Sequence, residues 1–185
     1  VSEVTDFGAL ITQTNNNHYT LTNGTTYILN NEVNTNRGYL YIESGSNVVI
    51  DLNGYSINRN LNTRTTNGFV ILNEGTLTIR NTGGGAEGKI TGGYNFGSGG
   101  GIYNKGNLTI EGGTIIGNKA EFYNSTVHQI GHGGGIMVES GSLHLKGGII
   151  TGNKSSLGYT LGGQGGGIYI NSSSSATLTI EGASQ

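Results

Sequence analysis

The sequence contains no cysteine and no proline, and only 11% of its 185 residues are charged. Without cysteine there is neither a disulfide framework nor a thiolate metal site, so the fold must be stable through its core alone. The absence of proline fits strands that pair on both sides, because proline would remove a backbone donor from each ladder. A formal net charge of -2 argues against broad attraction to nucleic acid or acidic lipid.

Long apolar runs are also missing. No segment approaches the roughly 18 apolar residues of a membrane helix, and no signal peptide precedes Val1. We therefore expect no membrane insertion and interpret the chain as a mature or trimmed fragment.

Glycine is abundant, with 36 residues that lack the three-residue period of collagen. They are interleaved with Val, Ile, Leu, Thr and Tyr, which predicts many short strands joined by tight turns. The length is that of a single domain with a continuous core.

A five-residue unit recurs along the second half of the chain. Its copies are Thr76–Arg80, Asn107–Glu111, Ser142–Lys146 and Thr177–Glu181, and their first leucines are 31, 35 and 35 residues apart. Such a step indicates a solenoid with one turn per repeat. Within each unit apolar and polar residues alternate, so Leu and Ile are expected to point inward, with Leu77, Leu108, Leu143 and Leu178 in one interior column.

Neighbouring segments repeat in step with this unit, which gives about three short strands per turn. The sequence therefore predicts an all-β fold, a right-handed parallel β-helix of about six coils. Asn118 and Asn153 fall at equivalent corners and are expected to form an asparagine ladder. Residues 1–38 are assigned to an N-terminal cap and first coil, with a short helix after Asp6, and residues 39–185 to the coils. The last strand shows no cap, so further coils or another domain are expected to follow it in the parent protein.

Residues 49–57 (VIDLNGYSI) and 100–118 (GGIYNKGNLTIEGGTIIGN) resemble bacterial cell-surface β-helix proteins of the pectin-lyase-like superfamily. They also look like a variant of the Gly-Gly-Ala-Ile and Phe-x-x-Asn repeats of polymorphic outer-membrane adhesins. The resemblance implies an extracellular location, on a bacterial surface or secreted, and a chain that is part of a longer surface protein. It does not select a ligand, because members include adhesins, stalks and polysaccharide-active enzymes.

The acidic residues argue against catalysis. Glycoside cleavage on this fold needs paired carboxylates, but the sequence has just two Asp, Asp6 and Asp51. Asp51 is expected to bond a turn. Arg80, Glu111, Lys146 and Glu181 share one repeat position, and Glu74, Lys105 and Glu139 nearly share another, which predicts two charge ladders along the coils. We expect no enzymatic activity and no cofactor.

The histidines and glycine runs give no stronger chemistry. His128 and His132 are four residues apart, but their glycine-rich surroundings make a helical metal pair improbable, so no metal site is expected. The glycine runs lack the Lys-Ser/Thr ending of a phosphate loop.

Insertions at one corner of successive coils provide the candidate ligand-binding residues. They should project from one edge of the solenoid, where per-repeat insertions often form the binding face. Aromatic rings beside Asn, Gln and His suit sugars, although the same rings also pack on one another to cover a sheet. The candidates are Tyr94, Phe96, Phe122, Tyr123, Asn124, His128, His132, Tyr159 and Gln164.

The leading functional hypothesis is a non-catalytic surface adhesin or binding module that recognises a glycan or a host surface protein. The alternatives are a structural stalk segment, a carbohydrate-active enzyme, and an ice-binding protein whose outward Thr ladder is interrupted by Ser142 and His144.

Overall fold

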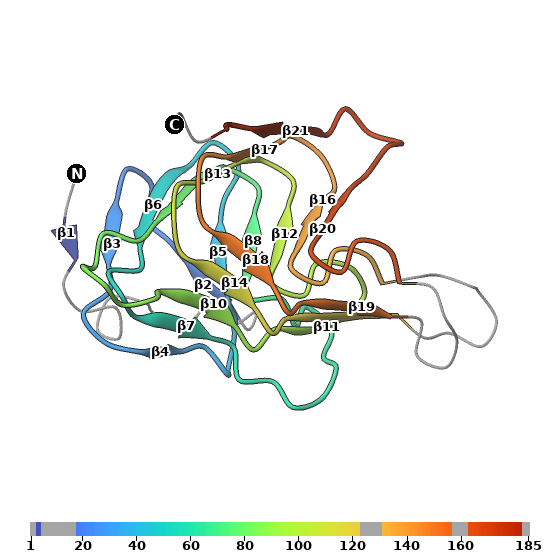
Figure 1. Ribbon diagram of the computed structural model, residues 1–185, viewed down its shortest axis with the longest axis horizontal. Coiled ribbons are helices and arrows are strands. Elements are labelled where there is room, and N and C mark those ends of the chain that lie inside the picture. The colour runs from blue at the N-terminus through green and yellow to red at the C-terminus, as the bar shows by residue number, and fades with distance from the viewer. Residues whose placement is uncertain (1–2, 5–17, 123–130, 157–162, 183–185) are drawn as a thin grey trace.

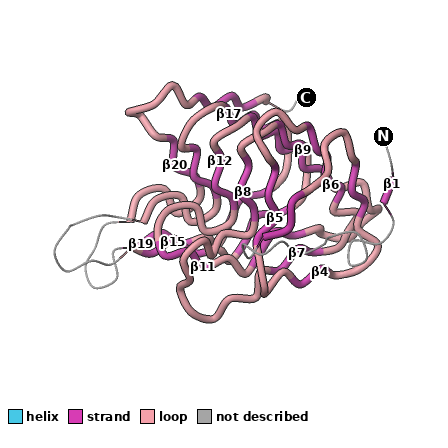
Figure 2. The backbone as a smooth tube through the Cα atoms, turned by 180° about the vertical axis from the view of Figure 1, so that it is seen from behind, coloured by secondary structure: helices cyan, strands magenta, loops and turns pink. Residues whose placement is uncertain are grey.

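The computed structural model describes residues 3–4, 18–122, 131–156 and 163–182, all of which are strand, turn or loop (Figures 1 and 2). The expected all-β class is confirmed for these residues. The helix predicted after Asp6 lies outside them. Within the described part of the chain, no helix is long and apolar enough to cross a membrane.

Four parallel sheets make up the walls. Sheet A contains β1 (Glu3–Val4), β3 (Thr26–Ile28), β6 (Asn47–Asp51), β9 (Thr76–Arg80), β13 (Asn107–Ile110), β17 (Ser142–Leu145) and β21 (Thr177–Ile180). Sheet B contains β2 (His18–Thr20), β5 (Tyr39–Ile42), β8 (Ile71–Asn73), β12 (Ile102–Asn104), β16 (Ile136–Val138) and β20 (Ile168–Ile170). Sheet C contains β4 (Val33–Asn34), β7 (Ser56–Asn58), β10 (Lys89–Thr91), β14 (Thr114–Ile116) and β18 (Ile149–Thr151). Sheet D contains β11 (Tyr94–Phe96), β15 (Lys119–Glu121) and β19 (Lys154–Ser156).

The chain visits sheets B, A and C in that order, later adds sheet D, and then returns to sheet B one level along (Figure 1). Each strand pairs with its equivalents in neighbouring coils, which defines a parallel β-solenoid. From β4 to β18 the described chain makes about four full turns. The expectation of about six coils was wrong, because the described strands before β4 and after β19 belong to sheets A and B alone. The right hand of the coil stays a prediction.

The predicted leucine column is confirmed. Leu108 is in register with Leu77 on one side and with Leu143 on the other, and Leu143 is in register with Leu178. The first three are fully buried, and Leu178 in the last strand is 39% exposed. Alternation within each strand therefore places the repeated aliphatic side chains in one continuous core.

The asparagine ladder is also present. The Asn118 side chain donates to the carbonyl of Ile90 at 3.0 Å and to Oδ1 of Asn153 at 3.1 Å, and it accepts from the backbone of Gly93 at 3.0 Å. Asn153 continues the pattern by donating to Ile115 at 2.8 Å. A second pair, Asn73 to Asn104 at 2.7 Å, was not foreseen.

The glycine runs are stacked turns. The backbone of Gly100 donates to Gly133, and Gly134 donates to Gly165, so the three runs form one ladder between sheets D and B. A Cβ added to Gly134 would lie 2.6 Å from the carbonyl oxygen of Gly166. Glycine is required there because neighbouring coils approach closely, and not for phosphate binding.

The charge ladders form in part. Lys105 pairs with Glu74 at 2.9 Å, and Lys146 lies 3.8 Å from Glu111. In the ladder of Arg80, Glu111, Lys146 and Glu181, the two end residues pair with residues outside the ladder. Arg80 binds Asp51 at 2.9 Å, and Glu181 lies 2.7 Å from Nε2 of His144. Asp51 thus extends the alternation of charges by one coil, because it is in register with Arg80.

Candidate functional site

Sheet D, whose strands β15 and β19 end shortly before the two long insertions in the sequence, positions the first group of candidate residues (Figure 1). Asn95 and Ala120 on its strands are buried, whereas Tyr94 and Phe96 are partly exposed. Strand alternation explains this difference, because neighbouring side chains point to opposite faces of the sheet. Tyr94 and Phe96 therefore lie on the outer face.

Phe96 and Phe122 pack against each other on this face. Their ring centroids are 5.1 Å apart and the ring planes are inclined by 20°, which is a stacked pair. The guanidinium carbon of Arg64 lies 5.3 Å from the Phe96 centroid, and Arg64 also binds Glu121 at 2.9 Å. A cation over an aromatic face and an ion pair beside it hold this pair of rings in place.

Tyr94 extends the cluster along the strand. Its hydroxyl donates to Oε2 of Glu121 at 2.8 Å, and Nζ of Lys119 lies 5.1 Å from its ring centroid. The hydrogen bond to Glu121 raises the pKa of the Tyr94 phenol, which therefore stays neutral at physiological pH. The result is an outer face, here named the sheet D cluster, made of Arg64, Tyr94, Phe96, Lys119, Glu121 and Phe122.

His132 and Gln164 form a second group. Their backbones form an isolated parallel bridge outside the named strands, and the His132 imidazole stacks on Tyr169 of β20 with centroids 4.2 Å apart and planes inclined by 16°. Burial lowers the pKa of His132, so its ring is neutral near pH 7. Tyr169 is in register with Met137, which is in register with Tyr103, and this column lies on the outer face of sheet B.

The structure describes five of the nine candidate residues predicted from the sequence. The structure brings Tyr94, Phe96 and Phe122 together and places His132 beside Gln164. Tyr123, Asn124, His128 and Tyr159 lie outside the described residues.

The buried or partly buried carboxylates are engaged in ion pairs or hydrogen bonds. Burial favours the neutral form of Asp51, but hydrogen bonds from Thr82, Asn53 and Arg80 outweigh it and lower the pKa. Hydrogen bonds from Tyr41 and Lys105 likewise lower the pKa of Glu74. The expected turn-bonding role of Asp51 is confirmed, since it accepts from the Asn53 backbone at 3.1 Å. Among the described residues, no group of three or more His, Asp or Glu could hold a metal ion.

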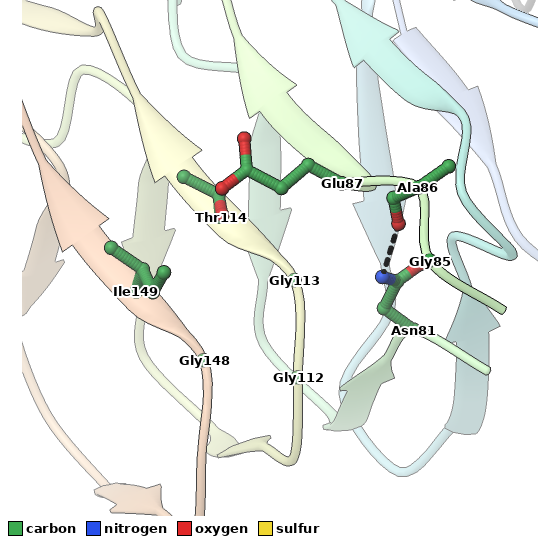
Figure 3. Close-up of a pocket in the computed structure, with 9 residues that line it drawn as sticks. All are labelled: Asn81, Gly85, Ala86, Glu87, Gly112, Gly113, Thr114, Gly148 and Ile149. Atoms are coloured by element: carbon green, nitrogen blue, oxygen red, sulfur yellow. Dashed lines mark hydrogen bonds between the residues drawn. The ribbon is translucent and has the colours of Figure 1, made fainter. Parts of the chain in front are cut away.

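A shallow groove lies at the corner between sheets A and C, away from sheet D, and was not predicted from the sequence (Figure 3). Its volume is about 330 Å³, and it is lined by Asn81, Gly85, Ala86, Glu87, Gly112, Gly113, Thr114, Gly148 and Ile149. The groove forms because residues 81–88 make a longer turn than the two glycines at 112–113 and 147–148 in the next coils. Asn81 holds that turn by donating to the carbonyl of Ala86 at 3.0 Å. This difference in turn length is the sequence feature from which the groove could have been predicted.

Fold and surface together define the class of the molecule, a parallel β-solenoid with an aromatic and charged corner. Comparison with protein-family models, with curated proteins and with solved structures finds no match. The resemblance to bacterial surface β-helix proteins therefore stays a hypothesis.

Proposed function

We propose that this chain is a non-catalytic binding module of a bacterial cell surface, and that it recognises a glycan of a host or partner surface through the sheet D cluster. The observation that carries the proposal is the stacked, partly exposed pair Phe96 and Phe122, bordered by Arg64 and Glu121. Aromatic faces bind the C–H faces of sugars, and charged groups beside them bind hydroxyls.

The geometry of the cluster supports binding of an extended ligand. Tyr94 and Phe96 lie on β11, and Lys119 and Glu121 lie on β15, which pairs in register with β11. Phe122 directly follows β15, and Arg64 comes from the loop between β7 and β8. The cluster therefore extends along the axis of the solenoid. The Arg64–Glu121 pair also fixes the side chains before a ligand arrives. Such preorganisation reduces the entropy lost on binding.

The state of the carboxylates supports binding without chemistry. A general acid for glycoside cleavage needs a raised pKa, whereas the pKa values of Asp51 and Glu74 are lowered by their partners. Glu121 is shared between Arg64 and Tyr94. Each of these acids therefore acts as a hydrogen-bond acceptor that stabilises the coils.

The proposed origin and location rest on the resemblance described above. We assign the chain to the adhesin-like β-helix repeats of the pectin-lyase-like superfamily and place it outside the cell. The alternative of a stalk segment predicts the same fold and no ligand.

A glycan array, followed by calorimetric titration of the best hit, tests the proposal. The wild-type protein is expected to bind at least one glycan, and Phe96→Ala or Phe122→Ala should weaken binding about tenfold, in line with roughly 1–1.5 kcal/mol for a lost aromatic contact. Tyr55→Ala is the matched control, because Tyr55 is an exposed aromatic residue away from the cluster.

Each protein must first show an unchanged circular dichroism spectrum and melting temperature. An array without a hit would contradict the proposal and favour the stalk segment. Equal affinity in all four proteins would contradict the sheet D cluster as the binding site.

A further inference from the structure

Arg59 is a charged residue inside the solenoid. It follows β7 at the corner where sheet C ends, on the same side of the strand as the fully buried Ile57, and it is only 4% exposed. The guanidinium group stays protonated in proteins, so burial cannot be relieved by loss of a proton. A buried cation of this kind needs a negative or hydrogen-bonding partner on each side.

The partners of Arg59 are incomplete. Nη1 donates to the carbonyl oxygen of Thr35 at 2.6 Å, but Nε is buried without a hydrogen-bond partner. The hydroxyl of Thr35, a residue only 2% exposed, is also buried without a partner. Among the described residues, no carboxylate forms an ion pair with Arg59.

The nearby tyrosines do not compensate the charge. Tyr19 and Tyr39 are the groups that favour the charged form of Arg59, against burial, which lowers its pKa. Burial and the neighbouring Glu74 raise the pKa of Tyr39, so its hydroxyl is neutral at physiological pH. A neutral phenol donates or accepts one hydrogen bond but carries no counter-charge.

In later coils the buried polar residue at this corner is an asparagine with hydrogen-bond partners. There Asn118 is fully buried, donates to Ile90 and Asn153, and accepts from Gly93. At this corner a later coil therefore has Asn118 with its hydrogen bonds formed, whereas an earlier coil has Arg59 with a donor left over. The unpaired donors of Arg59 and Thr35 are particular to the first coils.

We propose that Arg59 and Thr35 form a binding site for a small oxyanion, which is the carboxylate, sulfate or phosphate group of a ligand or of a free ion. Nε of Arg59 and the hydroxyl of Thr35 are both donors, and an oxyanion accepts from both while it neutralises the guanidinium. Planar carboxylates match the fork of the guanidinium group best. The site is separate from the sheet D cluster, and either site can fail without the other.

Thermal unfolding in acetate, sulfate or phosphate tests this site, with chloride as the reference at constant ionic strength. Once the free anion concentration exceeds the dissociation constant, the unfolding equilibrium constant of the wild type should fall about tenfold for each tenfold rise in the free anion concentration. Arg59→Met should lose this dependence. Lys146→Gln is the matched control, because it also removes one positive charge but from an exposed position.

Sulfate and phosphate stabilise most proteins by exclusion from the surface, so the difference between variants is decisive. The predicted dependence on anion concentration in the wild type and in Lys146→Gln, absent from Arg59→Met, supports the site. An equal effect in all three proteins, or none, overturns it. If Arg59→Met does not fold, the Nε–H signal of Arg59 in an NMR titration of the wild type decides, because a saturable shift supports binding and a constant signal refutes it.

Discussion

Single polar residues inside this solenoid are each stabilised by the coil above or below them. Asn118 shows this most clearly, because its amide bonds to three different residues in neighbouring coils. A buried donor or acceptor that loses its partner costs more than the hydrogen bond contributes. The interior polar residues are therefore fixed by their neighbours in space, and not by their own strand.

We expect Asn118→Ala to lower the free energy of unfolding by about 2–4 kcal/mol, because it leaves the Gly93 amide and the Ile90 carbonyl without their partner. Urea denaturation measures this loss. Asn62→Ala, at an exposed position, should change stability by less than about 0.5 kcal/mol. Similar values for both variants would show that the ladder contributes little.

The lowered pKa of the Asp51 carboxyl should make the stability of the protein depend on pH. Its hydrogen bonds with Thr82, Asn53 and Arg80 lower the pKa in the folded protein, so its stabilisation is full above the unfolded pKa of about 3.9. The stabilisation is lost as pH falls through the folded pKa. Melting temperatures from pH 7 to pH 2 should fall less steeply for Asp51→Asn than for the wild type, although the variant is less stable at pH 7. Parallel curves would contradict this role.

At the scale of the strand, the same residue contributes differently according to its level in the stack. Leu108 and Leu178 occupy one interior column, yet Leu108 is fully buried and Leu178 is 39% exposed. Truncation of a buried leucine removes its transfer free energy and leaves a cavity. A partly exposed leucine contributes less transfer free energy, so its truncation costs less.

Leu108→Ala should therefore lower the free energy of unfolding by about 3–5 kcal/mol, and Leu178→Ala by about 1 kcal/mol. Chemical denaturation of the two variants provides the comparison. Equal losses would mean that the column is not graded by burial.

In the glycine ladder, stability should be lost when side-chain volume is added, whereas in the leucine column it is lost when volume is removed. Gly134→Ala places a methyl group against the backbone of the next coil, whereas the environment of Gly84 is open. We expect Gly134→Ala to lower the melting temperature by roughly 4–12 °C, for a cost of about 2–3 kcal/mol. Gly84→Ala should change it by less than about 2 °C, and an equally small change in Gly134→Ala would refute the close approach.

At the scale of the whole molecule, the elements that repeat could be predicted from the sequence, whereas irregular ones could not. Leu77, Leu108, Leu143 and Leu178 occur at a nearly constant step, so their column followed from spacing alone. Arg59 and the turn at 81–88 have no equivalents in other coils. Their surroundings depend on three-dimensional contacts, so neither the buried cation nor the groove was foreseen. Sheet D was missed for the same reason, because it is a fourth wall that only some coils contain.

The graded burial along the axis predicts a graded rate of local opening. A solenoid is stabilised by contacts between adjacent coils, so a strand with one neighbour opens more readily than a strand with two. In β21, Leu178 and Ile180 are 39% and 67% exposed, whereas Leu77 and Leu108 in β9 and β13 are fully buried. Hydrogen exchange should therefore be fastest in β21, slower in β17, and slowest in β9 and β13. Uniform protection across these strands would mean that the solenoid unfolds as one cooperative unit, with no independent opening of its last coil.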